Sequence, residues 1–564
     1  MSRLSARSLM RLVLLSFVLC TISVHCHGGP GVHKCEHAKN FGSIKPRRMD
    51  EIDGSSRTLQ GIPTGSPTTT GGSTTGQTET NDGWHLLRIF VNWNYMKSFK
   101  TENPSLSTKY EFAVRMGEST RLYFQSILMV NFTPRLTLKT ATTCGDTPIP
   151  VLDIPYDLYV VMWPKNDNSG GAFASAGACF LSTRDNRPTV GRFIVNFANL
   201  KVGALYEQLH FPVFLHEFLH ILGFANNLYA EYVVPGTTRK RGVGEVTISM
   251  TAGSKTYNAI QLPEVVAWAK AYFNCQTLIG VPLEDGGGDG TAGSHWEKTY
   301  FPIEVMNPSI ELPVFFSGLT QALLRGTGWY YVKDYSDQYY NWGYFKGCSY
   351  FDAACPAIPE LYCTKSANNQ DTCAGHYYGK GQCMSLGSSL TNSNCDYYST
   401  RESSCLVAGS ELSPKENEVF GANSRCIDYK TGAGVYSTKC HSITCSGSGN
   451  SQTVTITVGS ASVTCTVADS GTATKTVGSL SIECPYVTRI CGTIAAQCPS
   501  DCNGRGICTQ EKKCYCYTGW SGTSCETAVQ LDYEKITFNE DKKNSNVFKL
   551  TLLMLALLLV NVFA

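Results

Sequence analysis

The chain has 564 residues, of which 16% are charged, and its formal net charge at pH 7 is +2. So small a charge gives no broad basic field and argues against nucleic-acid binding. The 25 cysteines would be reduced or metal-bound in the cytosol, whereas behind a secretion signal they indicate disulfides.

The first residues have the layout of a secretion signal. Basic residues precede an apolar run, 12–19, that is too short to span a bilayer comfortably. We assign residues 1–26 to a signal peptide, and an uncleaved membrane anchor is the alternative. A secreted chain would also suit a glycan at Asn131, in the single glycosylation sequon.

Residues 27–83 are expected to be a propeptide. Its last part, 61–82, is rich in Thr, Gly and Ser, so it cannot bury a core and would give a processing protease access. Cys35 stands apart from the cysteines of the later domains. Because a thiolate is a good metal ligand, Cys35 is a candidate to block a metal site further along the chain. A thiol without a regulatory role, or a separate cluster with His33 and His37, would be the alternatives.

Residues 84–330 are expected to form a domain of mixed helices and strands. Segment 110–125 has an ambiguous period, which we interpret as part helix and part strand. β-branched and aromatic runs predict strands at 86–92, 156–163, 172–180 and 191–197, and the last two flank a turn. Helices are predicted at 262–273 and 312–324.

The most informative pattern in this domain is H-E-x-x-H, formed by His216, Glu217 and His220. Residues four apart share a helical face, so two imidazoles can hold one zinc ion while the glutamate reaches a water beside it. Apolar neighbours favour a helix buried at the floor of a cleft. Pro212 would open this helix or lie inside a longer one, and Gly223 would end it. A core helix with two ordinary histidines is the alternative.

A zinc hydrolase needs a third protein ligand. A short metzincin pattern would place a histidine where this chain has Asn226, and the next histidine is His295. A glutamate ligand, as in gluzincin aminopeptidases, is the alternative, and Glu245 is its candidate. A glycine-rich run, 286–293, lacks the Gly-Lys-Ser/Thr of a phosphate loop and would instead turn the chain back toward the metal. Met306 then follows in a segment typical of a Met-turn, whose thioether packs near the metal without binding it.

These motifs together resemble the leishmanolysin family of surface zinc proteases, in which an insertion separates the glycine from the third histidine. The resemblance spans about residues 84–500 and includes the cysteine-rich stretch 348–363. It implies an α+β metzincin-type protease domain with a mixed sheet, an active-site helix and one catalytic zinc. Glu217 would be the catalytic base, Met306 the Met-turn residue and Cys35 the counterpart of a propeptide cysteine. The implied zinc ligands are His216, His220 and His295.

Residues 331–495 are expected to form a cysteine-rich domain that contains β structure, including a hairpin at 453–467. Thirteen cysteines lie within residues 348–491. Because thirteen is odd, at least one should bridge to Cys144, Cys179 or Cys275. Apart from Cys20, Cys26 and Cys35 the chain has 22 cysteines, enough for eleven bridges.

Residues 496–527 contain six cysteines spaced C-x3-C-x5-C-x5-C-x-C-x8-C. This spacing resembles an EGF-like module. Six cysteines alone allow fifteen connectivities, and the resemblance implies pairing of the first with the third, the second with the fourth and the fifth with the sixth. The module would serve as a spacer or as a surface for a partner.

Residues 528–564 form a stalk that ends in a hydrophobic tail, 550–564. Such a tail is typical of a glycolipid-attachment signal, and a retained membrane segment is the alternative. Asn544, Ser545 and Asn546 are the candidate attachment points.

The sequence therefore predicts a secreted or cell-surface zinc metalloendopeptidase that is anchored to the membrane and acts on proteins or peptides. A catalytically weak adhesion protein on a protease scaffold is the main alternative, because an EGF-like module and an anchor also suit adhesion. A purely structural secreted protein is a third possibility. The complete ligand set and Glu217 favour the enzyme, and zinc content with casein cleavage would separate these classes.

Overall fold

The computed structural model describes most of the chain between residues 83 and 537, together with two short earlier segments. The described ranges are 33–34, 46–48, 83–131, 135–168, 172–253, 255–288, 291–310, 313–363, 371–385, 395–406, 414–430 and 436–537. The predicted signal peptide, Cys35 and the hydrophobic C-terminal tail lie outside them. Across the described ranges, every helix is too short or too polar to cross a bilayer.

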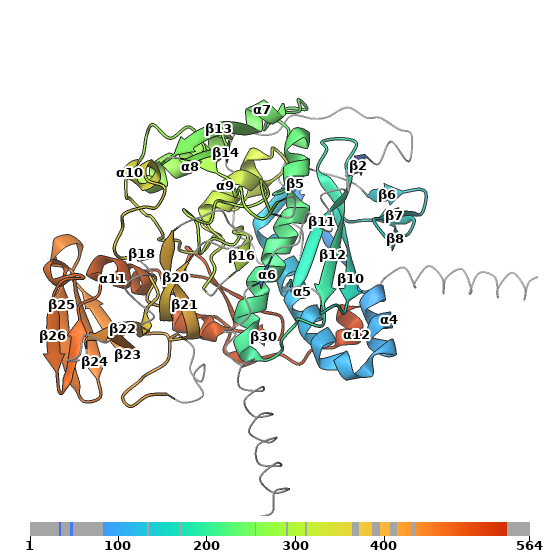
Figure 1. The fold of residues 1–564 in the computed structure, drawn as a ribbon. Helices are drawn as coiled ribbons and strands as arrows, with labels where there is room; N and C mark the ends of the chain where they lie inside the picture. Colours follow the sequence, from blue (N-terminus) through green and yellow to red (C-terminus); the bar gives the residue numbers. More distant parts are fainter. Residues whose placement is uncertain are drawn as a thin grey trace, which may run out of the picture. The chain divides into compact units, whose positions relative to one another are not determined.

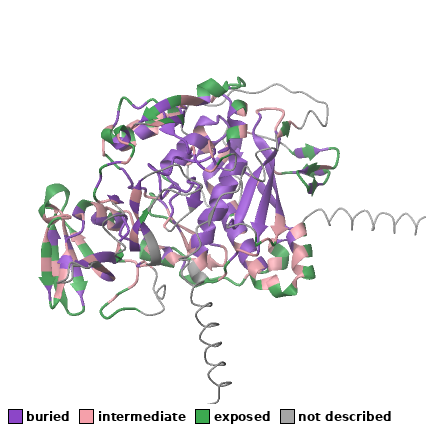
Figure 2. Cartoon of the chain, viewed as in Figure 1, coloured by how far each residue is buried: buried purple, intermediate pink, exposed green. Residues whose placement is uncertain are grey.

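A five-stranded sheet forms the centre of the first domain, with the order β2-β11-β12-β10-β4 (Figure 1). β12 and β4 run parallel to β10, whereas β11 is antiparallel to β12. The long strands are buried on both faces, and Figure 2 shows this burial. The strands predicted at 156–163, 172–180 and 191–197 are confirmed. Their bounds are β10 (Leu158–Lys165), β11 (Ala174–Leu181) and β12 (Pro188–Asn196), and the outer strands are β2 (Arg47–Arg48) and β4 (Ile89–Asn92).

Three predicted elements have different bounds in the structure. The single strand predicted at 86–92 is two strands, since the chain leaves one sheet after Leu86 and joins the central sheet at Ile89. Segment 110–125 is entirely helical, because its apolar residues pack against the helix that carries His216. The helix predicted at 312–324 begins only at Gly318, since Phe315 pairs through its backbone with Ile303 and Val305 instead.

The remaining elements of this domain surround the central sheet. The helices are α4 (Asn94–Glu102), α5 (Ser107–Ile127), α6 (Ala204–Leu222) and α9 (Gly318–Gly326). A three-stranded sheet has the order β17-β5-β3, with β3 (Trp84–Leu86), β5 (Leu128–Asn131) and β17 (Tyr331–Val332). Two small hairpins consist of β6 (Leu136–Leu138) with β9 (Leu152–Ile154), and β7 (Thr142–Cys144) with β8 (Thr147–Ile149).

Helix α6 packs against β11, β12 and α5, and it lies beside the central sheet in Figure 1. A glycine on β12 permits this close approach. A Cβ at Gly191 would lie 2.5 Å from Cγ2 of Ile221, which no real contact allows. The helix that carries the H-E-x-x-H pattern is therefore held at a fixed depth on a rigid sheet.

The insertion between His220 and His295 contains its own helices and sheet, and its buried residues join the core of the first domain. Its helices are α7 (Val243–Val246) and α8 (Pro263–Phe273), and its sheet contains β13 (Thr247–Ala252), β14 (Lys255–Ile260) and β15 (Val281–Pro282). The helix predicted at 262–273 is confirmed, and Pro263 occupies its first turn, where a missing N–H costs nothing.

The cysteine-rich region contains the β structure that was predicted for it. One sheet has the order β18-β21-β20-β19 and the other the order β25-β24-β23-β22-β27-β26, and α11 (Val487–Ala495) follows them. The hairpin predicted at 453–467 is β24 (Thr453–Val458) with β25 (Ala461–Thr466). The other strands are β18 (Tyr362–Cys363), β19 (Asp371–Cys373), β20 (Gly379–Ser385), β21 (Asp396–Ser404), β22 (Ser424–Lys430), β23 (Tyr436–Ser446), β26 (Thr474–Val477) and β27 (Leu480–Glu483).

Ten disulfides connect the described residues. The predicted tie between regions is Cys275–Cys348. The EGF-like pairing is confirmed by Cys498–Cys508, Cys502–Cys514 and Cys516–Cys525. The others are Cys144–Cys179, Cys363–Cys383, Cys373–Cys426, Cys405–Cys440, Cys445–Cys491 and Cys465–Cys484. The eleventh predicted bridge is not formed, since Cys355 and Cys395 are not joined, and Cys395 Sγ donates to Ala354 O at 3.2 Å.

The EGF-like module packs against the first domain. Its strands are β28 (Gly506–Cys508), β29 (Cys514–Cys516), β30 (Trp520–Ser521) and β31 (Thr527–Ala528), and α12 (Tyr533–Ile536) follows. The ring of Tyr517 lies 4.7 Å from that of Phe211 on α6, and the ring of Tyr515 lies 5.3 Å from that of Tyr123 on α5. The module therefore buries aromatic surface that α5 and α6 would otherwise expose.

Candidate metal centre

Helix α6 presents His216, Glu217 and His220, and all three side chains are fully buried. Pro212 lies inside this helix, so the longer of the two predicted helices is the one that forms. The helix stops at Leu222, and Gly223 adopts a φ of +153°, which side-chain-bearing residues rarely adopt. This turn sends the chain away from the sheet immediately after the second histidine.

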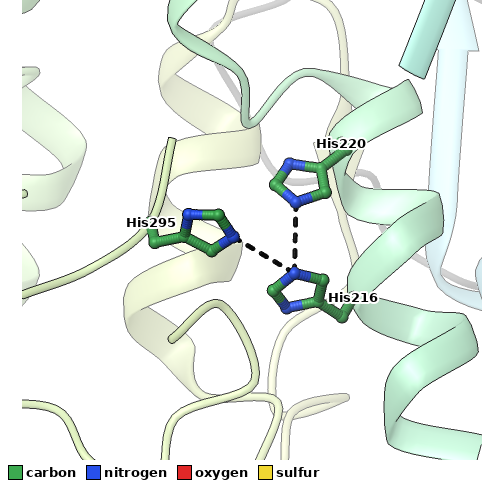
Figure 3. A group of neighbouring side chains, drawn as sticks. All are labelled: His216, His220 and His295. Atoms are coloured by element: carbon green, nitrogen blue, oxygen red, sulfur yellow. Dashed lines mark hydrogen bonds between the residues drawn. The ribbon is translucent and has the colours of Figure 1, made fainter. Parts of the chain in front are cut away.

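The third histidine arrives from the far side of the insertion. His295 is fully buried, and the ligand nitrogens of the three histidines lie within 4.8 Å of one another. The Nε2 atom of His216 is 3.1 Å from that of His220 and 3.3 Å from that of His295 (Figure 3). Two residues of one helix and one residue 75 positions later thus converge on a single point.

Each ring is oriented by a backbone carbonyl. Nδ1 of His216 lies 2.6 Å from the oxygen of Val305, Nδ1 of His220 lies 2.7 Å from that of Phe224, and Nδ1 of His295 lies 2.8 Å from that of Thr291. A carbonyl only accepts, so each Nδ1 must donate its proton. In the neutral rings Nε2 then carries a lone pair, which is the arrangement of a metal-ligating histidine.

This donor set fits a zinc ion. Three lone pairs that face one another at 3.1 and 3.3 Å repel unless a cation lies between them. A tetrahedral zinc with Zn–N bonds of about 2.0–2.1 Å separates its nitrogen ligands by about 3.3–3.4 Å. Imidazole nitrogen is also a ligand type that zinc favours.

The Met-turn segment adjoins the same centre. Its Val305 carbonyl orients His216, and its Met306 carbonyl accepts from Trp296 N at 2.9 Å, next to His295. Met306 is fully buried. Through its backbone, the segment therefore contacts both His216 and the residue that follows His295.

Glu304 is a structural residue of this segment to which the sequence analysis gave no role. Its carboxylate accepts from Met306 N at 2.5 Å, from Ser317 Oγ at 2.8 Å and from Thr320 Oγ1 at 2.6 Å. Burial raises the pKa of Glu304 to about 7, although these donors act to lower it. An acidic residue directly before a Met-turn was the available signal, because a buried turn needs an acceptor for its N–H groups.

The glutamate alternative for the third ligand is wrong. Glu245 is exposed on α7, where its carboxylate forms an ion pair with Arg239 at 2.8 Å and accepts from Gly242 N at 2.8 Å. These bonds lower the pKa of Glu245 to about 2, led by the hydrogen bond from Arg239. Among the described residues, the three histidines form the cluster that contains His216.

Two further candidate residues lie away from this centre. Asn131 is half-buried at the end of β5, and its Oδ1 accepts from Arg184 Nη2 at 2.9 Å. The rest of its sequon and Cys35 fall outside the described residues. However, β1 (His33–Lys34), which directly precedes Cys35, pairs antiparallel with β16 (Ser309–Ile310), just after the Met-turn.

Comparison with known proteins agrees with the class that this site indicates, a protein with a histidine metal centre. The family model of leishmanolysin matches residues 133–497, well over half of the chain. A model of the teneurin-like EGF domain matches residues 498–528. The chain therefore belongs to the leishmanolysin family, a family of zinc metalloproteases, and carries a C-terminal EGF-like module.

Individual relatives match only part of this chain, and at low sequence identity. A leishmanolysin homolog of Crithidia fasciculata is 28% identical over 299 residues, which cover 48% of this chain and 43% of the relative. A leishmanolysin-like peptidase of Drosophila melanogaster is 32% identical over 214 residues, which cover 33% of this chain and 31% of the relative. Leishmanolysin of Leishmania major is 26% identical over 238 residues, covering 40% and 36%. The chain thus matches less than half the length of each of these relatives.

Proposed function

We propose that this protein is a zinc metalloendopeptidase of metzincin type, in which His216, His220 and His295 hold one zinc ion. The observation that carries the proposal is the convergence of three Nε2 atoms whose rings each donate Nδ1–H to a carbonyl. Met306 would be the Met-turn residue. Protein or peptide substrates follow from the family, whose members are peptidases.

The proposed roles follow from where the groups lie. Zinc in this centre supplies Lewis acidity toward the scissile carbonyl and makes a neighbouring water more acidic. Glu217 lies on α6 between two of the ligands, so it is placed to accept the proton of the attacking water and return it to the leaving amine. The buried surroundings exclude bulk water and strengthen these electrostatic interactions.

Replacement of Glu217 tests the mechanism. Glu217→Ala should keep the zinc, because all three ligands remain. It should lower the rate of casein cleavage by a factor of roughly 10² to 10⁴. The measurements are zinc content by mass spectrometry and the initial rate of cleavage. Glu245→Ala, an exposed glutamate outside the histidine cluster, is the matched control and should keep both zinc and activity.

Three outcomes would contradict this proposal. Full activity in Glu217→Ala would exclude Glu217 as the base. Retention of zinc in His295→Ala would exclude the ligand set. A wild-type protein that binds zinc but does not cleave casein would favour the alternative, an adhesion protein on a protease scaffold.

We further propose that the protease is made as a latent, secreted precursor. In this proposal residues 1–26 are removed as a signal peptide, residues 27–83 are the propeptide and Cys35 blocks the zinc. Support comes from β1, which ends one residue before Cys35. β1 pairs with β16, the strand that follows the proposed Met-turn. A thiolate can take the coordination position that the attacking water needs.

We propose a location at the cell surface, with residues 84–330 as the protease domain, 331–495 as the cysteine-rich domain and 496–527 as an EGF-like module available to a surface partner. Residues 528–564 would supply the glycolipid signal, and Asn131 would carry a glycan. Mass spectrometry of the mature protein tests these assignments, since an unmodified C-terminus at Ala564 would exclude the lipid anchor.

A further inference from the structure

A second group of buried charges lies at the base of the loop that delivers His295. The two ends of this loop pair as short antiparallel backbone, with Glu284 N bonded to His295 O at 2.9 Å and Glu297 N bonded to Pro282 O at 3.1 Å. Leu283 and Trp296 form the bridge between these bonds. Glu284 and Glu297 therefore lie on opposite sides of the loop's entrance.

Three carboxylates gather at this entrance. Carboxylate oxygens of Glu284, Asp285 and Glu297 lie within 4.8 Å of one another. Glu284 is 1% exposed and Glu297 is 0% exposed, whereas the Asp285 side chain is 29% exposed. Two carboxylates are thus fully removed from water, and the third connects them with the surface.

The protein's own donors satisfy only part of this cluster. Glu284 accepts from Gly286 N at 2.8 Å and from Lys298 N at 3.3 Å. Oε1 of Glu297 accepts from Thr299 N at 3.1 Å and from Thr299 Oγ1 at 2.5 Å. Oε2 of Glu297 is buried and has no hydrogen-bond partner. A buried carboxylate oxygen without a donor is costly unless a cation or a proton neutralises it.

The neighbouring cations offset only part of the charge. Lys255 forms an ion pair with the exposed member, Asp285, at 2.8 Å. The Lys298 ammonium donates to Ser309 Oγ and lies over the ring of Tyr397. Neither of these contacts places an ammonium on Oε2 of Glu297.

We propose that Glu284, Asp285 and Glu297 bind a calcium ion, which fastens the base of the loop that carries His295. The ligands are all oxygens, which favours a hard cation over zinc. Calcium accepts several carboxylates in irregular geometry and completes its shell with carbonyls and waters, whereas magnesium demands a near-ideal octahedron. The partly exposed Asp285 provides the entry path.

The ion would act on the zinc centre through the backbone. Thr291 O orients His295, and Gly293 N bonds to Glu284 O at 2.8 Å within the same loop. Closing the loop's base with a divalent ion removes conformational freedom from the segment between these residues. Calcium should therefore raise the thermal stability of the whole protein without replacing zinc.

Direct binding measurements on the zinc-loaded mature protein test this proposal. Calcium should bind with a stoichiometry of one and raise the melting temperature, while zinc content stays constant. Terbium is a luminescent substitute for calcium, and the nearby Trp296 should sensitise its emission. Excess calcium should then quench that emission by competition. Glu297→Gln, which removes a charge but keeps the shape, should weaken calcium binding on the order of 100-fold.

Asp285→Asn supplies a second variant that should fold, because its side chain is partly exposed, and it should also weaken calcium binding. Glu245→Gln, an exposed glutamate of the same insertion, is the matched control and should bind calcium like the wild type. Two results would overturn the proposal. One is a wild-type protein that binds no calcium, in which case the two glutamates share a proton. The other is unchanged calcium affinity in both Glu297→Gln and Asp285→Asn, which would place the ion elsewhere.

Discussion

Gly223 links the end of a helix to the orientation of His220, a proposed zinc ligand. Its φ of +153° turns the chain so that Phe224 O accepts from Nδ1 of His220 at 2.7 Å. A Cβ at this position would also lie 3.3 Å from both Thr327 and Trp329. The residue is therefore required both for its backbone conformation and for its lack of a side chain.

We expect Gly223→Ala to destabilise the protein by about 1–3 kcal/mol, because alanine is strained at this φ. The substitution should also weaken zinc retention, since any shift of Phe224 O disturbs His220. Chemical denaturation and zinc content after dialysis are the measurements. Gly244→Ala is the matched control, because a Cβ there meets nothing within 4 Å, and it should be neutral or slightly stabilising. Equal stability of the two variants would contradict this account.

Asp157 makes the fold sensitive to acid at a site away from the zinc centre. Burial acts to raise its pKa, but hydrogen bonds from His85 and Arg88 and the charge of Arg187 outweigh it and lower the pKa from 3.8 to about 2. The Arg88 guanidinium binds both carboxylate oxygens, at 2.9 and 3.0 Å. A lowered pKa means that the ionised form stabilises the folded state above pH 4.

This contribution, about 2 kcal/mol, should be lost as the pH falls from about 4 to about 2. Urea unfolding of wild type and Asp157→Asn across that range measures it. Because any bound zinc would be released from both proteins in acid, the informative quantity is the difference between their free energies of unfolding. That difference should shrink toward low pH, and a constant difference would show that the charge of Asp157 does not contribute.

The composition of the histidine set could be predicted at the residue scale because its chemistry is local. H-E-x-x-H spacing places two histidines on one helical face with a glutamate beside the first, whatever the surrounding fold. His295 was harder to predict as the third ligand, because the position of Glu245 was also compatible with the spacing. Only the fold shows that Glu245 lies away from the other two histidines. The carbonyls of Val305 and Thr291 could not be assigned, because hydrogen bonds between distant segments leave no pattern in a single sequence.

Among the elements, strands buried on both faces were the most predictable. Their continuous apolar runs admit few alternatives, as β10 and β12 show. Segment 110–125 was misread because burial on several sides of α5 blurs the helical period. The helix predicted from 312 starts late, since Pro313 disfavours helical geometry in the residue before it and Phe315 finds backbone partners in the Met-turn segment.

The pairing of β1 with β16 leads to a prediction about latency. Cys35 follows β1 directly, so the precursor should be silent while its thiolate reaches the zinc. An unprocessed Cys35→Ser precursor should therefore cleave casein, because a serine hydroxyl is a poor zinc ligand. The comparison is with the unprocessed wild type, and the mature forms of both should have equal rates. A serine variant as silent as the wild-type precursor would show that Cys35 is an ordinary thiol.

At the scale of the whole molecule, the EGF-like module is part of the support for the protease helices. Tyr517 is 5% exposed and stacks near Phe211, five residues before His216 on α6. Thr518 N donates to Ser119 Oγ on α5 at 2.8 Å, and Gln510 Nε2 donates to Asp337 at 2.7 Å. Such contacts between regions could not be predicted from the sequence. The sequence indicated only that the EGF-like module is a spacer or a partner-binding surface.

Tyr517→Ala should lower the stability of the protein by about 3–5 kcal/mol, because it empties a buried aromatic site between two domains. The expected observation is a lower melting temperature together with easier proteolysis near α6. Tyr335→Ala, in which the replaced tyrosine is 67% exposed, is the matched control and should melt like the wild type. If Tyr517→Ala also melts like the wild type, the module does not support the protease domain.

The segment before the protease domain is attached at two separate places. β1 pairs with β16, and β2 pairs with β11 at the edge of the central sheet, where Arg47 Nη2 donates to Thr142 Oγ1 at 3.0 Å. Each attachment keeps the other at a high effective concentration, so together they hold far more tightly than either would alone. A single cut anywhere between residues 34 and 47 abolishes this avidity at once. The fragment that carries β1 can then depart although none of its contacts has changed, whereas β2 stays covalently joined to the chain that follows it.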